Sequence, residues 1–295
     1  MTFELLKGSI DNHIHCCPHI NKRSTDIFEV VKKAEQLKMY AIGLMDNFSN
    51  TSGYASLVKK YLPKTKLKVF GGLIMEPPSG GVNYENARIS LNYSYFGNDG
   101  AKFISFPTHH TRHIAKLENR KKNYIKNCFY VPDSGPTAET KKILRLIAKN
   151  NIVLNTGHLS AKETINLVKC AKKIGVKKIL IPSNTFNLKT ISNLKKYKVK
   201  FEFSYFFVSK ATDVPLTHVD GEKHKIQGTN ENLLKLLIKT AGPRNVILSS
   251  DCGVSILPKP HIGFIKFINQ IIKLGFKKKE IEYMIKINSK NLFNL

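Results

Sequence analysis

Short apolar runs alternate with longer amphipathic segments along the chain, and this alternation repeats eight times. The apolar runs are typical of buried strands. They occupy residues 8–15, 40–46, 67–74, 101–107, 151–158, 177–183, 200–205 and 245–251. Strand-then-helix units in series build a parallel sheet through right-handed crossovers, and eight such units allow the sheet to close. We therefore predict an α/β fold, an eight-stranded parallel β/α barrel of the TIM type, with residues 1–295 as a single domain.

The segments between the runs carry helix signals. Residues 25–38, 137–150, 160–175 and 230–242 have apolar side chains at spacings of three and four. Ser160 stands three residues before Glu163, as in a capping box, and glycines follow two of these segments at 175 and 242. An open doubly wound sheet is the alternative architecture, but no glycine-rich phosphate turn follows the first strand to support it.

Two connections are unusually long, residues 108–136 after the fourth strand and residues 206–228 after the seventh. Long loops in a compact domain are usually functional or disordered. In a barrel of this kind they would overhang the face that carries the active site.

Metal-binding side chains stand at the carboxyl ends of three predicted strands. His13 and His15 end the first strand, His158 the fifth and Asp251 the eighth. Alternate residues of a strand point to the same side, so the two histidines of the first strand can bind one ion together. Taken alone, a histidine at a strand end is more often a hydrogen-bonded structural residue, "NTGH" could close a strand, and "SSD" could cap the next helix. Together, three imidazoles and one carboxylate predict a site for Zn²⁺ or another divalent metal with a position left for water.

At this point the sequence resembles a known group. The segments "DNHIH", "NTGHLSAKETINLVKCAKKIGVKKILI", "FEFSY", "GPRNVILSSDCGV" and "INSKNLFNL" are similar to the amidohydrolase superfamily, in particular to an uncharacterised branch of metal-dependent hydrolase-like barrels. The similarity covers nearly the whole chain. It implies that His13, His15, His158 and Asp251 bind the metal.

The chain departs from the pattern of that group at three strand ends. The fourth strand ends in "FISFP" without a bridging Lys or Glu, which favours one metal over two. Met45 and Asn47 stand where relatives often carry Lys and His, and Ser183 stands where a histidine is common. These changes leave open a degenerate barrel that binds without catalysing.

The resemblance implies hydrolysis of a small-molecule amide, lactone or ester by a metal-activated water. A divalent ion lowers the pKa of bound water toward about 7 and polarises the substrate. Asp251 would contact the metal and also take the proton of the water. Glu202 is a candidate second acid or base or a substrate anchor, with a structural role in the barrel as the alternative. Asp11 is a candidate for orienting a ligand imidazole.

The cluster "PTHHTRH" follows the fourth strand. His109, His110 and Arg112 are candidates for substrate binding, with His113 beside them, and exposed loop residues are the alternative. Cys16, Cys17 and Cys252 adjoin the predicted ligands, where small packing residues are the simpler interpretation.

The formal net charge of +27 suits a polyanion binder, but the lysines are scattered over nearly every predicted helix. We therefore expect a solvated basic surface, a small-molecule substrate for which an anion is compatible, and no specific nucleic-acid partner. Adjacent cysteines in an odd total, no signal peptide and no long uncharged apolar stretch favour a cytoplasmic protein without a membrane span. Barrel faces commonly support dimers, so a homo-oligomer remains open.

Two other functions remain as alternatives. A phosphoesterase of the polymerase and histidinol phosphatase type also carries DxHxH, and it would recruit Glu76 into a site for two or three metals. A non-catalytic binding barrel would show salt-dependent retention on polyanions and need no metal.

Overall fold

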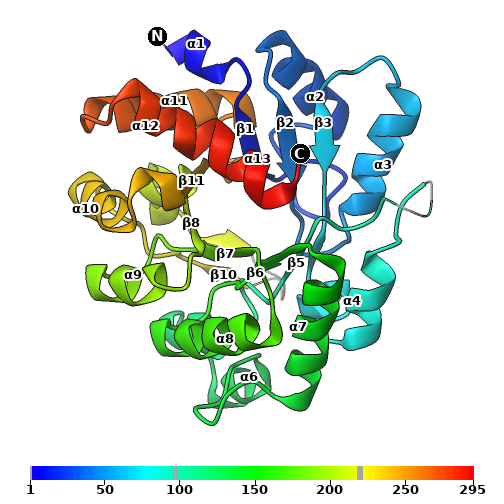
Figure 1. Ribbon diagram of the computed structural model, residues 1–295, viewed down its shortest axis with the longest axis vertical. Coiled ribbons are helices and arrows are strands. Elements are labelled where there is room, and N and C mark those ends of the chain that lie inside the picture. The colour runs from blue at the N-terminus through cyan, green and yellow to red at the C-terminus, as the bar shows by residue number, and fades with distance from the viewer. Residues whose placement is uncertain (1, 96, 98, 218–221) are drawn as a thin grey trace.

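The computed structural model describes residues 2–95, 97, 99–217 and 222–295. Within them, two sheets of parallel strands lie at the centre and helices surround them (Figure 1). One sheet has the order β1–β2–β3 and the other β11–β8–β7–β6–β5–β4. The strands are β1 Ile10–Ile14, β2 Ala41–Leu44, β3 Lys68–Phe70, β4 Leu73–Ile74, β5 Phe103–Ser105, β6 Val153–Asn155, β7 Ile179–Pro182, β8 Lys200–Ser204 and β11 Val246–Ser249.

The helices follow the strands in alternation, as the sequence pattern predicts. The capping box of Ser160 and Glu163 is present, and Gly175 ends its helix in a left-handed conformation. The α-helices are α1 Thr2–Leu6, α2 Ile27–Gln36, α3 Ser52–Tyr61, α4 Tyr84–Ser90, α5 Arg112–Leu117, α6 Lys122–Asn127, α7 Ala138–Asn150, α8 Ala161–Ile174, α9 Leu188–Lys195, α10 Glu231–Ala241, α11 Pro260–Lys273, α12 Lys278–Glu282 and α13 Asn288–Phe293. A π-helical segment, Tyr283–Ile287, joins α12 to α13.

The sheet differs from the single eight-stranded sheet that the sequence predicts. The expected third strand, residues 67–74, is divided at Gly71 and Gly72 into β3 and β4, which pair in different sheets. A Cβ on Gly71 would lie 2.4 Å from the carbonyl of Thr51, and one on Gly72 would lie 2.3 Å from the carbonyl of Phe103. At these two glycines the chain passes so close to the backbones of Thr51 and Phe103 that the hydrogen-bond ladder of the third strand is interrupted.

Both sheets nevertheless contribute to one inner core. Side chains alternate along the strands, so one set faces the helices and the other faces inward. At one end the inward set packs against Leu292 and Phe293 of α13. Its members on the strands are Ile10, Ala41, Phe70, Ile74, Phe103, Val153, Leu180 and Ile247.

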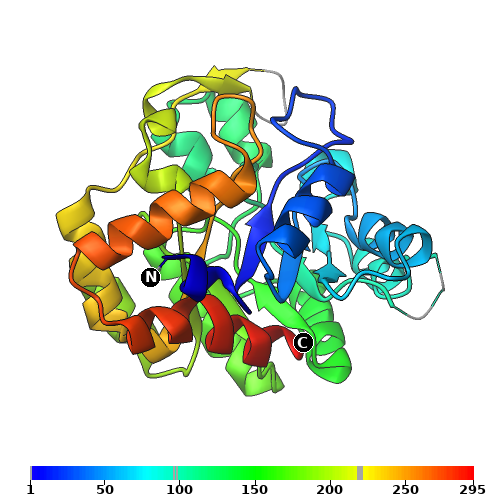
Figure 2. The same ribbon diagram turned by 90° about the horizontal axis from the view of Figure 1, so that it is seen from above.

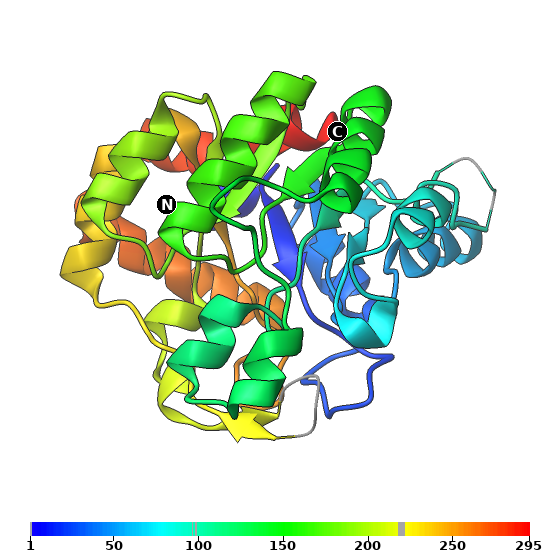
Figure 3. The same ribbon diagram turned by 90° about the horizontal axis from the view of Figure 1, so that it is seen from below.

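The two long connections are structured and lie beside one another (Figures 2 and 3). The first carries α5 and α6, and the second carries the antiparallel strands β9, Leu216–Thr217, and β10, Lys223–His224. Residues 218–221 of the second lie outside the described residues. Arg120, from the first connection, ion-pairs with Glu118 at 3.7 Å and with Glu222, from the second, at 3.5 Å, and it lies 2.7 Å from His224 Nε2. These contacts bind the two connections together.

In the part of the chain that is described, no helix combines the length and the apolar character that a membrane span requires.

Candidate metal centre

The backbone of β1 and that of the segment after β11 run side by side and bring the predicted ligands together. The Asp251 N–H donates to the His13 carbonyl at 2.9 Å, and the His15 N–H donates to the Cys252 carbonyl at 2.8 Å. A Cβ at Gly253 would lie 1.5 Å from the His15 carbonyl oxygen, so only glycine fits there. Asp251 itself has a φ of +51°, a conformation that aspartate tolerates better than most residues.

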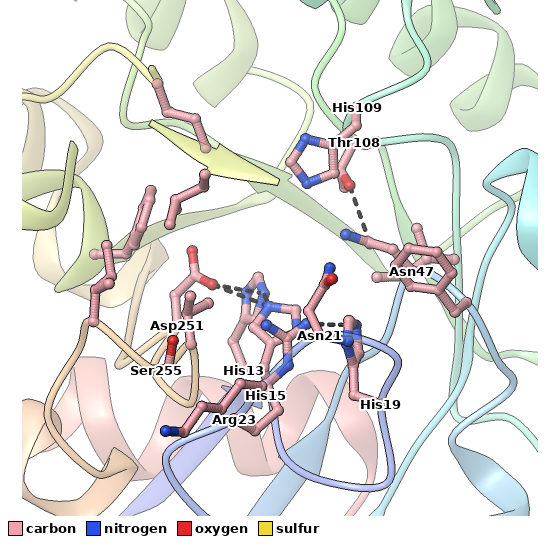
Figure 4. Close-up of a pocket in the computed structure, with 18 of the residues that line it drawn as sticks. His13, His15, His19, Asn21, Arg23, Asn47, Thr108, His109, Asp251 and Ser255 are labelled. Carbon is pink, nitrogen blue, oxygen red and sulfur yellow. Dashed lines mark hydrogen bonds and ion pairs between the residues drawn. The ribbon is translucent and has the colours of Figure 1, made fainter. Parts of the chain in front are cut away.

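Three ligand atoms converge at this point (Figure 4). His13 Nε2 lies 3.2 Å from His15 Nε2, and Asp251 Oδ1 lies 3.3 Å from the first and 3.2 Å from the second. Four ligands placed about 2.0–2.1 Å from a zinc ion in a tetrahedron are about 3.3–3.4 Å from one another. The three atoms therefore have the spacing of one face of such a tetrahedron, and the donor set of two imidazoles and a carboxylate fits a divalent metal.

A second layer of side chains contacts these predicted ligands. Glu202, on β8, is buried, and its Oε1 lies 3.2 Å from His13 Nδ1 and accepts a hydrogen bond from Asn12 at 2.9 Å. The hydroxyl of Ser204 donates to Asp251 Oδ2 at 3.2 Å. A carboxylate behind a ligand histidine fixes its ring and increases its basicity. Glu202 is thus placed to position His13.

Asp11 holds the backbone around the site rather than a ligand ring. Its Oδ1 accepts the N–H of Ser250 at 2.9 Å and the N–H of His13 at 3.4 Å. Burial raises the pKa of Asp11 to about 7. The expected contact with an imidazole is therefore replaced by hydrogen bonds to the main chain on both sides of the site.

The charges of the site set the protonation of its histidines when no metal is bound. Burial alone would lower the pKa of His13, but the carboxylates of Asp251 and Glu202 outweigh it and raise this pKa to about 9. Burial lowers the pKa of His15, and it lowers that of His158 to about 4. Burial opposes ionisation of Asp251, yet the neighbouring histidines hold its pKa below the usual range. Without a metal, the protonated His13 ring therefore supplies the positive charge between the carboxylates of Asp251 and Glu202.

The three predicted ligands line a cavity of about 330 Å³. His158 and His109 line it as well, with their ring centroids 6.5 Å apart. His158 lies outside the group of three converging ligand atoms, so its predicted role as a fourth ligand stays a prediction. A second cavity of about 560 Å³ adjoins the first and shares His158, Phe207 and Ile226 with it.

Two other predicted substrate-binding residues are not among those that line either cavity. The Arg112 guanidinium lies over the ring of Tyr130 and donates to the Lys126 carbonyl at 3.0 Å. The His110 ring makes an edge contact with Tyr124. Only His109 of this group borders the cavity.

Three positions at which the chain departs from the amidohydrolase pattern have distinct surroundings. Met45 is buried in the inner core, and the Ser183 hydroxyl is buried and donates to the Ile181 carbonyl at 2.6 Å. Asn47 lines the cavity and accepts a hydrogen bond from Thr108 at 3.3 Å. Of the three, only Asn47 is placed where a substrate would meet it.

Glu76 organises the loop after β5. Its carboxylate accepts the N–H groups of Thr108 and His109, each at 2.6 Å, and of His110 at 3.1 Å. Burial raises the pKa of Glu76. Both oxygens of Glu76 accept hydrogen bonds from this loop. Glu76 does not belong to the group of converging ligand atoms, whereas the phosphoesterase alternative needs it as a metal ligand.

The sequence analysis missed a polar group in the loop after β1. The side chain of His19 is buried, and its Nε2 lies 3.3 Å from Asp46 Oδ1, while the Asn21 N–H donates to its Nδ1 at 2.9 Å. Arg23 contacts His19, and all but Asp46 of this group line the cavity (Figure 4). The signal was present, because a third histidine and an arginine follow HxH in the loop at the active end of the first strand.

Comparison with solved structures shows the fold. An amidohydrolase from Pseudomonas aeruginosa is similar at a TM-score of 0.63 and 10% identity, over 99% of this chain and 98% of that one. A probable 2-pyrone-4,6-dicarboxylic acid hydrolase from Acinetobacter baumannii, with citric acid bound, has a TM-score of 0.62 and 12% identity over 98% of this chain and 100% of that one. An organophosphorus hydrolase from Deinococcus radiodurans has a TM-score of 0.56 and 12% identity over 99% and 93%.

The chain thus has the fold of amidohydrolases, which confirms the structural side of the resemblance. No curated protein matches the sequence. A family model matches residues 8–201, more than half of the chain, and the protein therefore belongs to that family, which is described as a family of unknown function (DUF6282).

Proposed function

We propose that this protein is a metal-dependent hydrolase with a mononuclear centre. The observation that carries the proposal is the spacing of three atoms at the carboxyl ends of the strands. His13 Nε2, His15 Nε2 and Asp251 Oδ1 each lie 3.2–3.3 Å from the others. His158, neutral and in the same cavity, would be the fourth protein ligand. The two sheets would then act as one closed barrel of eight units, with residues 1–295 as one domain.

The chemistry divides between the metal and the protein. A divalent ion, for which we propose Zn²⁺ from the donor set, would supply Lewis acidity and lower the pKa of a water. Asp251 accepts a proton from the attacking water and returns it to the leaving group, while Ser204 holds its second oxygen. Glu202 keeps the His13 ring aligned through its contact with Nδ1. We propose this positioning role for Glu202 in place of the acid or base role predicted from the sequence.

The substrate class follows from the cavity and from the neighbours. A volume of about 330 Å³ suits a small molecule. The structural neighbours are named as an amidohydrolase, a pyrone dicarboxylic acid hydrolase and an organophosphorus hydrolase. We propose an ester, lactone or amide substrate, with His109 at the cavity wall as a binding residue. His110 and Arg112 would act on the substrate only through the loop that carries them.

Metal stoichiometry tests the proposal. Untagged protein purified without chelator is analysed by elemental mass spectrometry, together with His13→Ala and the control His261→Ala, which changes a histidine of α11 outside the main cavity. We expect about one ion per chain in the wild type and the control and its loss from His13→Ala. Hydrolysis of an ester and lactone panel should follow the metal. Two or three ions would favour the phosphoesterase alternative, and none after incubation with metal would indicate a degenerate barrel.

The remaining properties are also proposals. All five cysteines are free, which suits a reducing cytoplasm. The partner would be a small molecule, without specific nucleic acid or membrane, and self-association would occur through barrel faces.

A further inference from the structure

The cavity that contains the metal ligands is rich in positive charge. Lys22, Arg23 and Lys223 line it, and the acid among its described lining residues is Asp251, which belongs to the ligand group. Apolar side chains from the second long connection form part of the wall, among them Phe206, Phe207, Leu216 and Ile226. The cavity therefore offers cations near the metal ligands and an apolar surface beside them.

Arg23 is held in a fixed backbone position. It pairs in antiparallel fashion with Val254, three residues beyond Asp251, and the N–H of Ser24 donates to the Gly253 carbonyl at 2.8 Å. The segment that carries this arginine is thus attached to the segment that supplies the carboxylate ligand. Figure 4 shows Arg23 beside His15 and His19.

The guanidinium has no acidic partner of its own among the described residues. Its Nε is buried without a hydrogen-bond partner, and its contact is with the His19 ring. The nearby Asp46 is already engaged, because it accepts from the Phe48 N–H at 3.0 Å and the Ser49 hydroxyl at 2.6 Å and pairs with His19. An imidazole ring carries no negative charge, so the His19 ring that Arg23 contacts cannot neutralise the guanidinium.

A partly buried cation without an anion is costly, and a guanidinium matches a carboxylate through two parallel hydrogen bonds. We propose that Arg23, with Lys22 at the cavity rim, binds a carboxylate of the substrate, so that the enzyme acts on organic acids whose ester, lactone or amide group reaches the metal. The apolar wall would receive the organic body of such an acid, which inorganic phosphate lacks. The proposal rests on the proposed function for the reaction, but the carboxylate site itself needs no metal.

Binding of malonate tests the site without a turnover assay. Isothermal titration is performed on metal-free and Zn²⁺-loaded protein in about 0.15 M salt, where distant surface charges are screened. The variants are Arg23→Met, Arg23→Lys and Arg145→Met, which removes an equal charge from an exposed position on α7. Dimethyl malonate and inorganic phosphate serve as neutral and inorganic probes, and circular dichroism checks folding.

We expect Arg23→Met to weaken malonate binding about tenfold or more in both metal states, since one charge-assisted hydrogen-bond pair is lost. Arg23→Lys should give an intermediate loss and also covers the case of a Met variant that does not fold. Arg145→Met should bind like the wild type. The proposal is overturned if malonate does not bind the wild type, if both charge-removing variants behave alike, or if the diester or phosphate binds as well as malonate. Absence of metal with intact malonate binding would instead refute the hydrolase and leave the carboxylate site standing.

Discussion

Replacing Gly253 by alanine tests whether the metal ligands depend on the close approach of two backbone segments. The new Cβ would lie 1.5 Å from the His15 carbonyl oxygen, whereas ordinary contacts begin near 3.4 Å, so the segments must separate by about 2 Å. That movement breaks the hydrogen bonds from His15 N–H to Cys252 and from Ser24 N–H to Gly253, both 2.8 Å long. Each bond contributes about 1 kcal/mol, and the positive φ of 126° adds about 1–3 kcal/mol of strain.

We therefore expect Gly253→Ala to lower the free energy of unfolding by about 3–5 kcal/mol and to abolish metal retention. Gly275→Ala is the matched control, because its φ is +87° but a Cβ there would meet nothing within 4 Å. It should cost only the backbone strain of about 1–3 kcal/mol, without the loss of the two hydrogen bonds, and keep the metal. Urea denaturation of metal-free protein and elemental analysis measure both effects. Equal destabilisation by the two variants, with metal retained in both, would refute the steric argument.

Three further predictions concern the ligands and the scaffold. Glu202→Gln should weaken metal binding about 10–100-fold, measured by chelator competition above pH 9, where His13 is unprotonated. The control Glu85→Gln, at an exposed position, should leave the metal affinity unchanged. Unchanged affinity in Glu202→Gln would remove Glu202 from the positioning role. Metal affinity should rise by up to about tenfold per pH unit toward pH 9 and then level off. The reason is that His13 has a raised pKa, so at lower pH a proton competes with the metal for its ring. An affinity that does not change with pH would contradict this. Ser160→Ala should cost about 1 kcal/mol in urea denaturation without affecting the metal, and a loss of metal would show that α8 supports the site.

The elements of the fold were predictable where the signal is local. The alternation of apolar runs located the strands of the two parallel sheets, though not β9 and β10, and Ser160 with Glu163 located the start of α8, because both depend on neighbours in the sequence. The division of the third strand was not predictable. It arises where Gly71 and Gly72 approach the backbones of Thr51 and Phe103, and such contacts appear only when the chain is folded.

The site shows the same limit. His13, His15 and Asp251 could be expected to meet, because the carboxyl ends of parallel strands gather at one end of the sheet. The sequence could not tell whether Glu202 would face the solvent or a ligand ring, since its partner His13 is 189 residues away. Nor could it separate His109, which borders the cavity, from Arg112, three residues on, which lies over Tyr130. Those directions depend on the helix that begins at Arg112.

The ion cluster around Arg120 has a consequence for changes of specificity in this family. Because Arg120 of one long connection is paired with Glu222 of the other, and His224 lies against it, the two loops contact each other directly. Grafting the second loop from a relative would remove Glu222 and His224 from a largely buried arginine and leave it with Glu118 of its own loop. Exchanging the two loops as a pair would preserve the contacts between them, whereas exchanging one loop would break them.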